Sequence, residues 1–169
     1  MITKKQVKAI LDLFKEPDIK YRDYFKYVRF NKVNDEQCLE LTNSYIAVRL
    51  NFEFDESLMD KYVSINHLEK WYKLASAKDI LTKSDFSEIN ENHLRSDEQF
   101  PSLDSIFNQE PRESAGAALS AKRLEMMSRI LDSDFCDLEM TSLNGSENFI
   151  AYKMTTKTGT GVLAGMRGN

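Results

Sequence analysis

The 169-residue chain contains few of the residues that staple or break a fold: two cysteines, three prolines and six glycines. A chain of this length buries roughly 70% of the surface that its unfolded form exposes, so it needs no disulfide or metal to fold. We therefore interpret Cys38 and Cys136 as buried thiols in a reducing, cytoplasmic compartment, with a disulfide as the alternative.

Long apolar runs are also absent. No segment reaches the roughly 18 uninterrupted apolar residues that a membrane-spanning helix requires. The first 16 residues carry lysines and an amphipathic pattern but lack the apolar centre of a signal peptide. We expect no membrane partner and no export signal.

Residues suited to metal or catalytic chemistry are scarce. The two histidines, His67 and His93, do not join cysteines at a metal-binding spacing. The acidic stretch 132–137 lacks the glycine and the closing glutamate of a calcium loop. No phosphate-binding loop or nucleophile elbow is present, and Gly159-Thr160-Gly161 has the composition of a hairpin turn. The sequence therefore favours a protein without a cofactor that binds rather than catalyses.

Three segments have helical periodicity: residues 2–15, 64–76 and 119–131, with Thr3, Ser64 and Ser120 as suitable N-terminal caps. The apolar positions predicted to face the core are Val7, Ile10, Leu11, Phe14, Leu68, Trp71, Tyr72, Ala75, Leu124, Met127 and Leu131. Residues 1–16, 64–78 and 119–131 each carry a net charge of +2, so the rest of a chain whose total is −4 carries −10. We therefore expect three positively charged helices in a protein whose remaining residues are negatively charged.

Six runs have the composition of strands: residues 27–32, 38–42, 45–54, 136–141, 148–154 and 161–167. In the third run, apolar residues at even positions alternate with Arg49, Asn51 and Glu53, which predicts a half-buried antiparallel strand. Residues 79–115 are polar and irregular, and we expect a linker or surface excursion there. Together the runs predict an α+β fold.

The last third of the chain echoes the first. Residues 2–7 resemble 119–124, residues 39–42 resemble 138–141 and residues 46–50 resemble 150–154, in the same order. Coincidence is the alternative, because Leu, Glu and Lys are common. A duplication predicts one domain over residues 1–169, with repeat units at about 1–54 and 115–169 and a helix and irregular insertion at about 63–114. Its helices would lie on one face of a continuous sheet.

Three short motifs resemble the bacterial DNA polymerase sliding clamp (beta clamp) family. Residues 39–48 (LELTNSYIAV) are similar to that family's strand–turn–strand, and residues 100–107 (FPSLDSIF) to the segment between clamp units. Residues 161–167 (GVLAGMR) are similar to its closing strand, with Gly165 in place of a proline. Full-length clamps have three domains and this chain has room for about one. The resemblance therefore implies a single-domain relative of the kind that phages or mobile elements encode.

The resemblance implies a processivity factor of DNA replication, a homo-oligomeric ring whose inner wall is helical and basic. Six single domains would complete such a ring. Lysines and arginines on the positive helices would contact the phosphates of double-stranded DNA without reading bases. The expected DNA-binding residues are Lys5, Lys8, Lys73, Lys122 and Arg129, although solvated faces of amphipathic helices would look the same.

The resemblance also implies a pocket for short partner peptides beside the closing strand. The expected pocket residues are Leu163, Met166 and Arg167, with burial of Leu163 and Met166 in the core as the alternative. Two other functions stay open. One is a clamp-fold module that binds DNA polymerase or other replication proteins but no DNA. The other is an unrelated α+β protein, which a deep pocket with paired titratable groups would favour.

Overall fold

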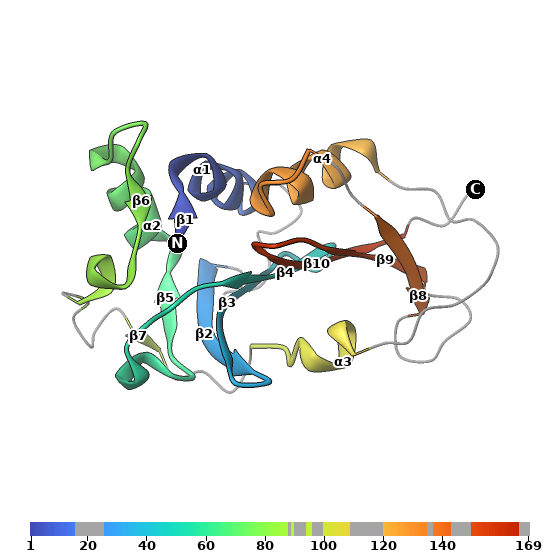
Figure 1. Ribbon diagram of the computed structural model, residues 1–169, viewed down its shortest axis with the longest axis horizontal. Helices are drawn as coiled ribbons and strands as arrows, with labels where there is room; N and C mark the ends of the chain where they lie inside the picture. The colour runs from blue at the N-terminus through green and yellow to red at the C-terminus, as the bar shows by residue number, and fades with distance from the viewer. Residues whose placement is uncertain are drawn as a thin grey trace.

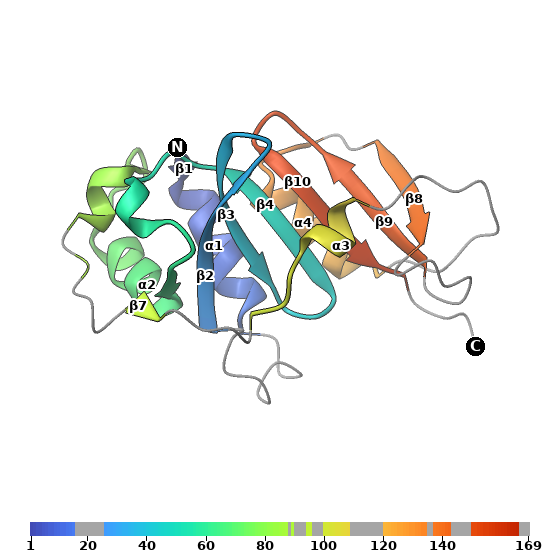
Figure 2. The ribbon, with the colours of Figure 1, turned by 90° about the horizontal axis from the view of Figure 1, so that it is seen from below.

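The computed structural model describes residues 1–15, 26–87, 89, 94–95, 100–108, 120–134, 137–142 and 150–165. At its centre is an eight-stranded antiparallel sheet in the order β7-β5-β2-β3-β4-β10-β9-β8 (Figures 1 and 2). Its strands are β2 (Tyr27–Val33), β3 (Glu36–Thr42), β4 (Ile46–Asn51), β5 (Tyr62–Ser64), β7 (Leu94–Arg95), β8 (Leu138–Ser142), β9 (Ile150–Thr155) and β10 (Gly159–Ala164). A separate pair joins β1 (Ile2–Thr3) to β6 (Ile80–Leu81). The predicted α+β class is confirmed.

Three ten-residue helices lie side by side on one face of the sheet: α2 (Ile65–Leu74), α1 (Lys4–Leu13) and α4 (Ala121–Ile130), with α1 in the middle (Figure 1). The short helix α3 (Asp104–Phe107) lies on the opposite face (Figure 2), so the prediction that the helices share one face is wrong for α3. Two 3₁₀ helices, η3 (Glu56–Leu58) and η4 (Lys83–Phe86), complete the helical elements of the described residues. None of the helices described here is long and apolar enough to cross a membrane.

The three long helices begin at the predicted caps. The Thr3 hydroxyl accepts from the Gln6 backbone N–H at 3.3 Å, and the Gln6 side chain accepts from the Thr3 backbone N–H at 2.9 Å, which forms a complete capping box. The Ser64 hydroxyl accepts from the Asn66 backbone, and the Ser120 hydroxyl from the Arg123 backbone. These bonds satisfy backbone donors that a helix start leaves unpaired.

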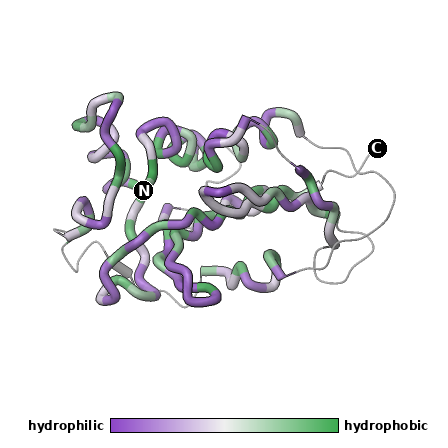
Figure 3. The backbone as a smooth tube through the Cα atoms, in the orientation of Figure 1, coloured by the Kyte–Doolittle hydropathy of each residue, from purple (hydrophilic) through white to green (hydrophobic). Residues whose placement is uncertain are grey.

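The main core lies between the sheet and the three long helices. In α1 the hydrophobic residues face the sheet and the hydrophilic residues form the outer turns (Figure 3). Of the helix positions predicted to face inward, five are only partly buried: Phe14, Trp71, Tyr72, Ala75 and Leu124. Met126 and Ile130 of α4 are buried, although they were not among the positions predicted to face inward.

A second, smaller apolar cluster covers the other face of the sheet. It contains Ala47, Tyr62, Phe100, Leu103, Phe107, Ala151 and Val162. β4 is therefore buried on both faces, and the prediction of a half-buried strand is wrong because residues 100–108 cover the side that carries Arg49. The segment 79–115 is likewise no surface excursion where it is described, since Leu81, Phe86 and Leu103 are buried.

The two halves of the sheet meet where β10 pairs with β4, from Gly159 opposite Leu50 to Leu163 opposite Ile46. A Cβ added to Gly159 would lie 2.0 Å from the Arg49 backbone oxygen, and one added to Gly161 would lie 2.7 Å from the Met127 sulfur. Gly159 is therefore required by its close approach to backbone, whereas at Gly161 the contact is with the flexible Met127 side chain. The predicted hairpin turn at residues 159–161 is wrong, because the turn between β9 and β10 occupies residues 156–158.

The strand order is symmetric about this junction. On one side lie β4, β3 and β2, which follow α1 in the chain; on the other lie β10, β9 and β8, which follow α4. The sequence echoes matched β3 with β8 and β4 with β9. The sheet order instead makes β3 equivalent to β9 and β4 equivalent to β10, so the matched strands are one position out of register.

Replacing Gly159 with alanine tests the junction between β4 and β10. The added methyl group meets backbone rather than a flexible side chain, so we expect a loss of about 2–3 kcal/mol in the free energy of unfolding. Urea denaturation measures the loss. Thr155→Ala, at an exposed position of β9, serves as the control and should stay within about 0.5 kcal/mol of the parent. An equal effect of both substitutions would contradict the close approach.

Candidate nucleic-acid interface

Two of the predicted DNA-binding residues, Lys5 and Lys8, lie on the outer face of α1. Lys5 and Lys8 are exposed, and neither makes an ion pair within the described part of the chain. They stand three residues apart, so their side chains are neighbours on one helical face. Both therefore remain available to an anionic partner.

The other predicted cations are partly engaged or lie toward the ends of the face. The Arg129 Nη2 atom lies 3.3 Å from the Asp12 carboxylate, which joins α4 to α1. The Lys73 Nζ atom lies 3.4 Å from the Glu69 carboxylate of the same helix. Lys122 is exposed in the first turn of α4. Exposed pairs of this kind contribute little to stability, so a phosphate group can displace them.

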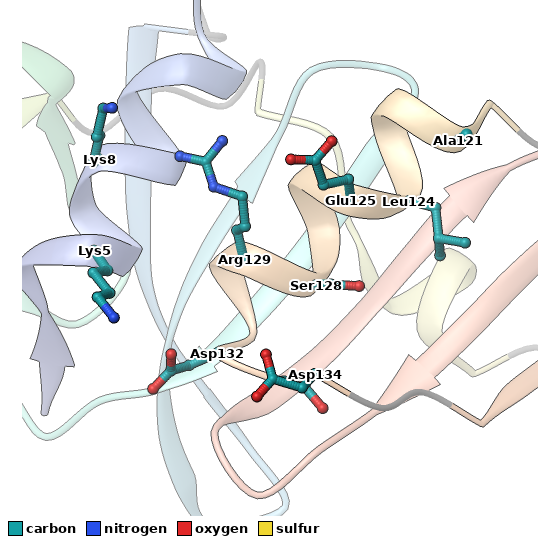
Figure 4. Close-up of a pocket in the computed structure, with 10 residues that line it drawn as sticks. Lys5, Lys8, Ala121, Leu124, Glu125, Ser128, Arg129, Asp132 and Asp134 are labelled. Carbon is teal, nitrogen blue, oxygen red and sulfur yellow. The ribbon is translucent and has the colours of Figure 1, made fainter.

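A groove of about 760 Å³ runs between α1 and α4 (Figure 4). Its lining residues are Lys5, Lys8, Ala121, Leu124, Glu125, Ser128, Arg129, Asp132, Ser133 and Asp134. Figure 4 shows Arg129 reaching from α4 toward α1, with the carboxylates on the α4 side. Three cations thus meet three carboxylates, and the groove itself is not basic.

Buried and half-buried contacts fix the three helices relative to one another. The Gln6 side chain, which is buried, donates from Nε2 to the Ile130 carbonyl oxygen at 2.9 Å. This bond ties the start of α1 to the end of α4. On the other flank, the Lys4 ammonium lies 4.8 Å from the centre of the Tyr72 ring and donates to the Ala75 carbonyl oxygen. The outer face is therefore a preorganised surface.

The predicted peptide pocket is not supported at its described residue. Leu163 is fully buried in the main core, because its strand β10 lies in the middle of the sheet beneath α4. Met166 and Arg167 lie outside the described residues. Beside this strand, the Arg123 guanidinium stacks at 3.6 Å from the centre of the Tyr45 ring.

A line of charged side chains, with Glu40 and Arg49 buried at its centre, crosses the opposite face of the sheet. Arg29, Glu40 and Arg49 stand directly opposite one another on β2, β3 and β4. The Glu40 side chain is fully buried and lies 2.7 Å from Arg49 Nε and 3.5 Å from Arg29 Nη1. Asp60 and Asp104 extend the line, at 2.6 Å from Arg29 and 2.5 Å from Arg49. We call these five residues the charge ladder.

The charge ladder holds residues 100–108 against the sheet. Besides its bond to Asp104, the Arg49 guanidinium lies 4.3 Å from the centre of the Phe107 ring. Lys153 of β9 donates to the Phe107 carbonyl oxygen at 3.2 Å. A cavity of about 310 Å³ opens beside these contacts, and Cys38, Arg49 and Lys153 are among its lining residues.

This cavity offers no thiolate nucleophile at neutral pH. Burial, assisted by the neighbouring Glu40 charge, raises the pKa of the Cys38 thiol to about 12. Cys38 is a free and buried thiol, as predicted, whereas Cys136 lies outside the described residues. The arginine at the cavity wall already has two carboxylate partners.

Metal-binding geometry was not found in the part of the chain that the structure describes: no group of three or more His, Cys, Asp and Glu side chains could hold an ion there. His67 has a structural role, because its Nε2 atom lies 2.8 Å from the Asp85 carbonyl oxygen and its ring stacks on Phe86. His93 lies outside the described residues.

The charge ladder was not predicted from the sequence. Its signal was a charge flanked by two apolar residues in each of three successive strands, with alternating sign: Arg29, Glu40 and Arg49. A charge flanked in this way is seldom left unpaired when it is buried. The ion pair between Arg49 and Asp104 could not be predicted from the sequence, because it depends on where the distant segment 100–108 folds.

Comparison with protein-family models, with curated proteins and with solved structures found no match to this chain.

Glu40→Gln tests the charge ladder. The substitution keeps the shape of the side chain but leaves two arginines without their shared buried carboxylate, so we expect a loss of about 2–4 kcal/mol in unfolding free energy. Chemical denaturation measures it. Glu139→Gln, at an exposed position of β8, is the matched control and should be nearly neutral. A neutral Glu40→Gln variant would show that the ladder does not stabilise the fold.

The raised pKa of Cys38 predicts a slow alkylation reaction. At pH 8 a thiol with a pKa of about 12 is ionised on the order of 10³-fold less than an ordinary cysteine. In a Cys136→Ser background, iodoacetamide should therefore label the native protein at least that much more slowly than the urea-unfolded protein. The native rate should still be rising at pH 10. A plateau near pH 8.5 would contradict the assignment.

Proposed function

We propose that this protein is a non-enzymatic, sliding-clamp-like accessory of DNA replication that holds duplex DNA without reading its sequence. The observation that carries the proposal is the outer face of α1, α2 and α4, three adjacent helices on one side of a continuous sheet. On that face Lys5 and Lys8 are exposed and have no ion-pair partner among the described residues.

The strand order supports the clamp-like part of the proposal. A helix precedes each set of three antiparallel strands, and the two sets meet through β4 and β10. A duplicated helix-and-strand unit would produce this arrangement, with the two helices brought together on one face. Such a domain is also what the resemblance of residues 39–48, 100–107 and 161–167 to the clamp family implies.

Sequence-independent binding follows from the chemistry of the face. Lysine side chains attract phosphates and release the counterions around DNA, whatever the base sequence. The carboxylates Glu125, Asp132 and Asp134 on the α4 side of the groove repel phosphates. We therefore place the DNA along α1 and α2, over Lys5, Lys8 and Lys73, with Lys122 and Arg129 at its margin.

Encircling DNA would require several copies. One chain offers a single helical face, and each of its three ten-residue helices is about 15 Å long. A homo-oligomer of six such domains would complete a ring of the kind that the resemblance implies. DNA polymerase or another replication protein in the cytoplasm would be its partner.

A second candidate function is a clamp-fold module that binds replication proteins and no DNA. The balance of charge in the groove between α1 and α4 favours it, because a mixed-charge surface suits a protein better than a polyanion.

Lys5→Glu/Lys8→Glu tests the DNA contact. Fluorescence anisotropy of a short labelled duplex of mixed sequence, titrated at several salt concentrations, should show affinity that falls steeply with salt. The double variant should bind at least about tenfold more weakly, and its salt slope should be smaller by about 1.8, since each lost phosphate contact removes about 0.9.

Lys83→Glu/Lys157→Glu is the matched control. It makes the same change in net charge at exposed lysines of η4 and the β9–β10 turn, neither of which lines the groove between α1 and α4. It should keep the parent slope. If the parent protein fails to bind any duplex at about 50 mM salt, the DNA-binding proposal fails and the interaction-module alternative takes its place.

A further inference from the structure

The groove between α1 and α4 holds unpaired charges of both signs. Lys5 and Lys8 on the α1 side make no ion pair with a described residue, and neither do Glu125, Asp132 and Asp134 on the α4 side. Among the described residues, the ion pair that bridges the two helices joins Arg129, which reaches toward α1 in Figure 4, to Asp12. The monomer thus exposes two lysines along one wall and three carboxylates along the other.

Such a surface is poorly matched to a uniformly charged partner. A polyanion satisfies the lysines but is repelled by the carboxylates, and a polycation has the opposite difficulty. The matching partner carries carboxylates opposite α1 and cations opposite α4. A second copy of the same face meets that requirement when a two-fold axis lies over the groove, because each α1 then faces the α4 of its partner.

We propose that a second copy of this chain docks face to face on the groove between α1 and α4. In this dimer Lys5 and Lys8 of each copy lie against the carboxylates of the α4 side of the other. Leu124, which is half-buried, and Ala121, which is exposed, give the contact a small apolar element.

The expected dimer is weak and sensitive to salt. Its charges are exposed, so ions screen them within about 10 Å at 0.1 M salt. The groove needs little rearrangement, because the Gln6 bond to Ile130 and the Arg129 pair with Asp12 already fix α1 against α4. A surface ordered before binding loses less entropy when it docks.

The dimer and the proposed DNA contact share Lys5 and Lys8. Self-association does not depend on DNA binding, but one consequence rests on the proposed function: DNA and the second copy exclude each other. DNA then dissociates the dimer, and by linkage the dimer weakens DNA binding as protein concentration rises.

Complementary charge reversal tests the docking mode. One variant, Lys5→Glu/Lys8→Glu, makes both walls of the groove acidic; the other, Glu125→Lys/Asp134→Lys, makes both walls basic. Asp132 is left unchanged because its backbone has a positive φ of 49°. Sedimentation velocity at low salt should show concentration-dependent dimers of the parent, monomers of each variant alone, and a restored dimer when the two variants are mixed.

The same variants keep the two proposals distinguishable. Glu125→Lys/Asp134→Lys should lose the dimer yet bind duplex DNA at least as tightly as the parent. A dimer that persists while no variant binds DNA would support the docking mode and end the DNA proposal. Circular dichroism and thermal unfolding establish that each variant is folded, and Lys83→Glu/Lys157→Glu should dimerise like the parent.

Three results would overturn the docking mode. The first is a parent protein that sediments as a single 19.6 kDa species at every concentration and salt. The second is a dimer or larger assembly that both folded charge-reversal variants retain. The third is a mixture of folded variants that stays monomeric where the parent dimerises.

Discussion

The pairing of β4 with β10 is the contact on which the rest of the structure depends. It joins strands that are more than a hundred residues apart in the chain into one sheet, and it brings α4 beside α1 above that sheet. Gly159 and Gly161 permit it, because one faces the Arg49 backbone and the other lies beneath Met127 and Leu131. A side chain at Gly159 would clash with the Arg49 backbone and push the two halves of the sheet apart.

The two faces of the sheet carry different kinds of charged groups. The helical side carries the exposed charges, and its helices are fixed by caps and by the buried Gln6 bond. The opposite side carries the charge ladder and the cover of residues 100–108, where the buried Glu40 carboxylate is paired with Arg49 and Arg29. Structural charges are thus kept away from the proposed contact surface, where Lys5 and Lys8 remain available.

The sequence predicted the parts of this arrangement that are local. Helical periodicity and the caps Thr3, Ser64 and Ser120 located all three long helices within a few residues. What it could not predict is non-local. The burial of β4 on both faces depends on where residues 100–108 fold, and the partners of Arg129 and Arg49 depend on how helices and segments pack. For the same reason, counting charges along α4 suggested a basic helix, whereas the folded groove is balanced.

The proposed function requires this helical face to hold duplex DNA within a closed assembly of clamp-like domains. Gel filtration of the protein with closed circular DNA, and with the same DNA linearised, tests this requirement. We expect the protein to co-elute with circles at moderate salt and to be lost from linear DNA, because an encircling protein slides off free ends. Equal retention on both forms would contradict a clamp, and no retention on either would contradict DNA binding altogether.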